Sequence, residues 1–153
     1  MTPRLFDDLY AVTMTLLPPQ MDGREGRNMV YAIGRQESRL VHRRQIGGPA
    51  RGLFQFERGG GTRGVLNHSG TATPIRHVLT ALNYTDDLDE CFAALEHNDI
   101  LAIAFARLLL WTVPGPLPKQ GEHQRAWEYY VEGWRPGKPH RQTWDAFYDE
   151  AWG

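Results

Sequence analysis

Glu37 is the one charged residue in the apolar stripe of a predicted helix. If residues 28–41 form a helix, its inward-facing stripe contains Val30, Ile33 and Leu40, and Glu37 lies among them. Burial raises the pKa of a carboxyl group, because it disfavours the charged form. A carboxyl that is still protonated near neutral pH has the chemistry of a general acid. The alternative interpretation is a glutamate at the edge of the core that pairs with a nearby arginine.

A loop and a short strand are predicted to follow this helix. Residues 42–50 are polar and basic and end in a Gly-Gly-Pro run, which is typical of a loop. Residues 53–57 alternate in the manner of a strand, which places Gln55 and Glu57 on the face opposite two phenylalanines. Gln55 and Glu57 are therefore expected to point the same way.

These residues resemble a known family. Glu37-Ser38, a loop and then Ala50-Arg51-Gly52-Leu53-Phe54-Gln55 are similar to the soluble lytic transglycosylase branch of the lysozyme-like superfamily, whose members carry Glu-Ser followed by Gly-Leu-Met-Gln. The resemblance covers residues 33–55 well and residues 98–111 loosely. The sequence as a whole is similar to those of small lysozyme-like proteins encoded by tailed bacteriophages.

The resemblance implies a mainly α (α+β) lysozyme-like fold, in which helices surround a buried central helix and a small β-hairpin lies beside the cleft. Residues 100–110 are apolar nearly all round, which suits such a central helix. Residues 63–73 are expected to complete the hairpin or an extended lobe. The length of 153 residues predicts that residues 1–153 form a single domain.

The resemblance also implies a reaction, namely cleavage of the β-1,4 bond between MurNAc and GlcNAc in peptidoglycan. Glu37 would protonate the leaving oxygen and then act as a base towards the muramoyl 6-hydroxyl, giving a 1,6-anhydro product without a second carboxylate. If the enzyme is instead a hydrolase, a second carboxylate could activate water. Glu57 is then the nearest candidate; otherwise it would hold an arginine or the hairpin.

Further residues are assigned to substrate binding by the same resemblance. Gln55 matches the cleft amide of the family and is expected to position either the sugar or the acid. Ser38 is expected to be a hydrogen-bond partner near the acid, because no Ser-His-acid grouping is legible. Phe54 and Trp111 lie beside family-matched segments and are the candidates for sugar contact. Other aromatic residues have helical spacing and are expected in the core, namely Trp127, Trp134, Trp144 and Tyr148.

One part of the family pattern is missing. Family members carry Ala-Tyr-Asn-Ala-Gly at the end of the central helix, whereas this chain has Ala106 and Arg107 where Tyr and Asn should stand. The alternative function is therefore a catalytically inactive lysozyme-like protein that serves as a structural or adaptor part of a phage particle. Retention of Glu37 favours catalysis, because a buried carboxylate is costly to keep.

Charge and composition limit the partners. The formal net charge of −1 gives no reason to expect a nucleic-acid partner. An arginine cluster near the candidate site could hold the carboxylates of peptidoglycan stem peptides, or it could be a solvated face. The cluster consists of Arg35, Arg39, Arg43, Arg44, Arg51, Arg58 and Arg63. The six histidines show no metal-ligand spacing and the single cysteine has no partner, so neither a metal nor another cofactor is expected.

Localisation is expected to depend on other proteins. The residues after the basic residue near the N-terminus lack the apolar segment of a secretory signal. The most apolar run, residues 101–111, is too short to span a membrane. The protein is expected to be made in the bacterial cytoplasm. It would reach peptidoglycan glycan strands as an endolysin released through a holin, or as a virion-associated protein held by other virion proteins.

Overall fold

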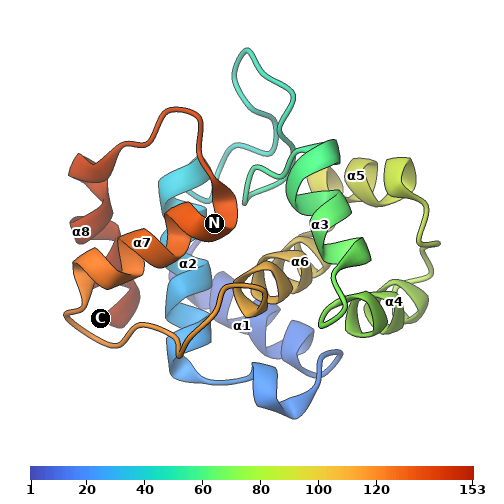
Figure 1. Ribbon diagram of the computed structural model, residues 1–153, viewed down its shortest axis with the longest axis horizontal. Coiled ribbons are helices and arrows are strands. Elements are labelled where there is room, and N and C mark those ends of the chain that lie inside the picture. The colour runs from blue at the N-terminus through green and yellow to red at the C-terminus, as the bar shows by residue number, and fades with distance from the viewer.

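Helices make up the fold, and no β-sheet is present in the computed structural model, which describes residues 1–153 (Figure 1). In chain order the α-helices are α1 Pro3–Met14, α2 Arg24–Ser38, α3 Arg63–Asn67, α4 Ala72–Ala81, α5 Leu88–His97, α6 Asp99–Trp111, α7 His123–Trp134 and α8 Arg141–Trp152. A 3₁₀ turn, Pro19–Met21, and a π-type turn, Arg58–Thr62, complete the elements. The prediction of a mainly α protein is confirmed.

Helix α6 is the centre of the core. All residues from 101 to 110 are buried, and α1, α2, α3, α4, α5 and α7 pack around the helix. Asn98 is the N-cap of the helix, and its side-chain oxygen accepts a hydrogen bond from the Leu101 amide at 3.0 Å. In Figure 1, α7 and α8 lie at the left, α3, α4 and α5 lie at the right, and α6 lies in the middle. The predicted buried helix is confirmed.

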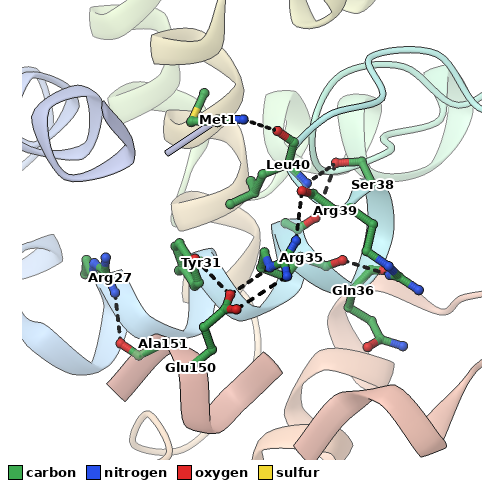
Figure 2. A network of polar contacts seen from close by, with 11 residues as sticks. Met1, Arg27, Tyr31, Arg35, Gln36, Ser38, Arg39, Leu40, Glu150 and Ala151 are labelled. Carbon is green, nitrogen blue, oxygen red and sulfur yellow. Dashed lines mark hydrogen bonds and ion pairs between the residues drawn. The ribbon is translucent and has the colours of Figure 1, made fainter. Parts of the chain in front are cut away.

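Helix α8 holds α2 in place by polar contacts. Tyr31 Oη and Arg35 Nε of α2 donate to Glu150 Oε2 of α8 at 2.8 and 2.7 Å, and Arg27 Nη1 donates to the Ala151 carbonyl at 2.9 Å (Figure 2). These contacts run along one side of α2. They fix the direction of the helix whose last turn carries Glu37.

The predicted strand at residues 53–57 is wrong. Residues Gly52 to Gln55 form a tight turn instead, closed by two 2.9 Å backbone hydrogen bonds between Arg51 and Phe56. Gly52 has φ +80° and Gln55 has φ +53°, and these left-handed conformations break the alternation that a strand requires. A second isolated bridge joins Arg44 to Arg51, so the segment has local backbone pairing without a strand.

Residues 63–73 also differ from the prediction. They contain α3 and the start of α4 rather than half of a hairpin. Val65 and Leu66 are buried, and α3 packs against α6, so tertiary packing outweighs the weak helix propensity of the nearby glycines and asparagine. No helix combines the length and apolar character that crossing a membrane would need.

Candidate active site

A cleft of about 700 Å³ contains Glu37. Its walls come from the last turn of α2, from the segment that follows α2, and from the end of α7 with the loop that leads to α8. The residues that line it and that could act on a ligand are Glu37, His42, Arg44, Gln45, Gln55, Glu57, Trp134, Arg135, Lys138 and His140. The lining is predominantly polar.

The Glu37 carboxyl is half-buried and has one hydrogen-bond donor. Tyr130 Oη of α7 donates to Glu37 Oε1 at 2.5 Å. Burial raises the pKa of Glu37 to about 7, and the Tyr130 hydrogen bond lowers it in part. Burial and the neighbouring carboxyl raise the pKa of Tyr130, so its hydroxyl remains a donor. A large fraction of Glu37 is therefore protonated at neutral pH, which suits a general acid.

Glu37 has no arginine partner, so the alternative interpretation of a salt-bridged glutamate is wrong. Arg35 pairs with Glu150 instead. Arg39 donates to the carbonyls of Arg35 and Gln36, both at 2.9 Å, and its guanidinium lies over the ring of Phe147. Since both nearby arginines are engaged elsewhere, no cation holds the Glu37 carboxyl in its charged form.

Ser38 joins the end of α2 to the turn at residues 52–55. Its buried hydroxyl donates to the Leu53 carbonyl at 2.6 Å and accepts from the Leu40 amide at 3.2 Å. Figure 2 shows the contact between Ser38 and Leu40 at the end of the helix. Ser38 does not line the cleft. It therefore positions backbone near the acid, and the structure does not place it where it could touch a substrate.

Gln55 and Glu57 both line the cleft with Glu37, although they do not come from a strand. Gln55 Nε2 donates to the Gly52 carbonyl within its own turn at 2.9 Å, which orients its amide. Glu57 is exposed and has no ion-pair partner. Both residues line the same cleft as Glu37, and their chemical roles remain predictions.

The two aromatic residues assigned to sugar contact lie outside the cleft lining. Phe54 is 1% exposed and belongs to the core, and Trp111 is 44% exposed at the end of α6. Trp134 lines the cleft instead, and its indole Nε1 donates to the Phe54 carbonyl at 3.0 Å. Helical spacing suggested a core residue at position 134. The proline-containing loop that follows Trp134 is the signal that could have placed it at an edge.

A hydroxyl partner for the acid is present, but on another helix than the family pattern indicates. Arg107 of α6 is buried and donates from Nε to the Met21 carbonyl at 2.8 Å, outside the cleft. Tyr130 of α7 reaches Glu37 instead. Sequence reasoning missed Tyr130, because 93 positions separate it from Glu37 and its own helix shows only an aromatic repeat.

Four of the seven arginines of the cluster form ion pairs with carboxylates, so the cluster is not a wholly free basic patch, while Arg44 and Arg58 stay exposed to solvent. Its ion pairs are Arg35–Glu150, Arg43–Asp99, Arg44–Glu96 and Arg58–Asp89. Arg51 donates to the carbonyls of Gly48 and Ala50. Three of these pairs attach the segment after α2 to α5 and α6.

No group of three or more His, Cys, Asp or Glu residues could hold a metal ion.

No family model, curated protein or solved structure was found to match this chain. Its function is therefore inferred from the site and from the sequence pattern around Glu37.

Proposed function

We propose that this chain is a phage-encoded muramidase of the lytic transglycosylase type, with a lysozyme-like fold, that cuts the β-1,4 bond between MurNAc and GlcNAc in peptidoglycan. The observation that carries the proposal is the Glu37 carboxyl, which lies in a polar cleft of about 700 Å³, has no cationic partner and has a pKa raised to about 7. A carboxyl in this state donates a proton at the pH at which bacteria live.

In the first step, the protonated Glu37 transfers its proton to the glycosidic oxygen. The bond between this oxygen and C1 of MurNAc breaks, GlcNAc leaves with a free 4-hydroxyl, and positive charge develops at C1. Glu37 is now a carboxylate, and the Tyr130 hydroxyl at 2.5 Å stabilises its new charge. Gln55 lies in the same cleft, where its turn holds it ready to contact the sugar.

In the second step, the Glu37 carboxylate removes the proton of the muramoyl 6-hydroxyl. The 6-oxygen then attacks C1 and closes the 1,6-anhydro ring, and Glu37 is protonated again for the next turnover. One carboxyl therefore serves as acid and base. Hydrolysis would require water in place of the 6-hydroxyl, and Glu57 is the other carboxylate of the cleft that could activate it.

Mass spectrometry of the fragments released from purified sacculi tests this proposal. The wild-type protein should release muropeptides with 1,6-anhydro ends, and Glu37→Gln should release none. Reducing ends would indicate hydrolysis and make Glu57 the next residue to substitute. Absence of any release by a folded wild-type protein would refute the enzymatic proposal and favour the inactive structural or adaptor role.

A further inference from the structure

Two cations at the rim of the Glu37 cleft have no anionic partner in the protein. Arg135 and Lys138 lie on the loop between α7 and α8, are exposed, and line the cleft. Eight other arginines each form an ion pair with a carboxylate, namely Arg27, Arg35, Arg43, Arg44, Arg58, Arg76, Arg125 and Arg141. Other basic residues also lack a carboxylate partner, among them Arg39, Arg63 and Lys119, but of the unpaired cations only Arg135 and Lys138 line the cleft that contains the acid.

The loop that carries these cations is attached at both ends to the site. At its start, Trp134 Nε1 donates to the Phe54 carbonyl at 3.0 Å. At its end, the His140 carbonyl accepts from Gln36 Nε2 of α2 at 2.8 Å. Gln36 is the residue next to Glu37. Pro136 and Pro139 further restrict the loop backbone, so the backbone that carries the two cations is restrained beside the acid.

The charge balance of the cleft favours an anionic ligand. Glu57 is the one carboxylate in the lining besides Glu37, whose pKa of about 7 leaves it only partly ionised at neutral pH. Arg44 also lines the cleft, but Glu96 already pairs with it. Arg135 and Lys138 therefore leave an excess of positive charge in the cleft, which attracts anions and raises their local concentration.

We propose that Arg135 and Lys138 form a binding site for carboxylate groups at the rim of the cleft, and that its ligands are the carboxylates of the peptide stems of peptidoglycan. This inference rests on the proposed function. A glycan backbone of neutral sugars offers hydroxyl and amide oxygens but no anion, whereas the stems attached to it carry carboxylates. A guanidinium and an ammonium form charge-assisted hydrogen bonds with such groups.

Binding to sacculi tests the site independently of catalysis. The Glu37→Gln protein, which cannot degrade the sacculi, is compared with the same protein that also carries Arg135→Gln and Lys138→Gln. Lys119→Gln in the Glu37→Gln background is the matched control, because Lys119 is exposed and unpaired but lies outside the cleft. We expect the double substitution to weaken co-sedimentation with intact sacculi about fivefold, and the control to have no effect.

Two further substrates identify the ligand. Sacculi with chemically amidated carboxylates, and glycan strands whose stems are removed by an amidase and whose freed lactyl carboxylates are then amidated, should bind the protein with and without Arg135 and Lys138 equally well. Equal binding of intact sacculi by both proteins would overturn the site. A loss that persists on the strands with amidated lactyl groups would also overturn it, because the residues would then contact sugar. If the wild-type protein cleaves nothing, a carboxylate-dependent difference in binding still supports the site. The binding site and the enzymatic activity can therefore be refuted independently of each other.

Discussion

At the scale of single residues, the costliest feature of the site is the buried acid itself. The folded protein holds the Glu37 proton more tightly than the unfolded chain, because burial raises the pKa from 4.5 to about 7. Stability is therefore lost as pH rises from the unfolded-state pKa to the folded-state pKa, and the loss is complete above pH 7. A residue that served only the fold would not carry this penalty.

Glu37→Gln should abolish cleavage and stabilise the protein in a pH-dependent way. Glutamine retains an oxygen that accepts from Tyr130 but has no charge to desolvate. We expect the advantage of the variant over wild type to grow between pH 4.5 and pH 7, by up to about 3 kcal/mol. Urea unfolding at pH 4.5 and pH 8 measures it. An advantage of the same size at both values would contradict a buried, titrating Glu37.

Tyr130→Phe should change how the acid titrates. The Tyr130 hydrogen bond lowers the pKa of Glu37, so its loss should raise that pKa and move the alkaline limb of the pH–rate profile to higher pH. The carboxyl also loses the bond that orients it, which should reduce kcat about tenfold. Tyr129→Phe is the matched control, because the Tyr129 hydroxyl donates to backbone carbonyls, among them that of Val113 at 3.1 Å. A profile that shifts equally in the control would refute a direct effect on Glu37.

At the scale of elements, the turn at residues 52–55 is positioned by a close approach to α5. A Cβ atom on Gly52 would lie 2.5 Å from the Leu95 carbonyl oxygen, and Gly52 also has φ +80°. Gly47 has a similar φ of +72° but open space around it. The two glycines therefore separate the effect of backbone conformation from the effect of the contact.

Gly52→Ala should destabilise the protein by more than about 2 kcal/mol, because it adds a steric clash to the conformational cost. Gly47→Ala should cost only about 1 kcal/mol, since conformation alone opposes it. Urea unfolding of both variants gives the comparison. Because Gln55 lies on the same turn, Gly52→Ala should also reduce cleavage of sacculi at temperatures where it is folded. Equal destabilisation by both substitutions would show that the turn does not pack against α5 as described.

At the scale of the whole molecule, the contact between α2 and α8 joins the C-terminal part of the chain to the helix that carries the acid. Burial would raise the pKa of Glu150, but the hydrogen bonds from Arg35 and Tyr31 outweigh it and hold the pKa below its ordinary value. The contribution of Glu150 to stability is therefore present above its unfolded-state pKa and is lost as pH falls through the lower folded-state pKa.

Glu150→Gln should lower the free energy of unfolding by about 1 kcal/mol at pH 7, which corresponds to a Tm decrease of roughly 2–4 °C. The difference should shrink in acid, where the wild-type carboxyl is also protonated. Asp145→Asn is the control, because the Arg141–Asp145 pair lies within one exposed helix face and should contribute less than about 0.5 kcal/mol. The Tm of wild type and of both variants, measured by thermal unfolding at pH 7 and pH 3, tests this prediction. A Glu150→Gln effect no larger than that of the control would show that α8 does not hold α2 by this contact.

The sequence by itself determined most of the helices, with α3 as an exception, because apolar periodicity is a local property of the chain. The repeat that placed Glu37 in an inward stripe predicted a helix at residues 28–41, whereas α2 spans Arg24–Ser38 and Leu40 lies beyond its end with φ +55°. The continuous apolar run predicted the buried α6. The strand predicted at residues 53–57 failed for a local reason too, since nothing in an alternating pattern reveals that Gln55 adopts φ +53°. Alternation is consistent with a strand but does not exclude a tight turn.

Only the tertiary structure decided which groups meet. Tyr130 contacts Glu37 across 93 positions, and Asp99, Glu96 and Asp89 neutralise arginines that looked free in the sequence. The choice of partner for a polar side chain depends on which helices pack together, and the pKa of an acid depends on how deeply that packing buries it. The sequence therefore indicated the acid, whereas the tertiary packing that buries Glu37 decided that its pKa rises to about 7.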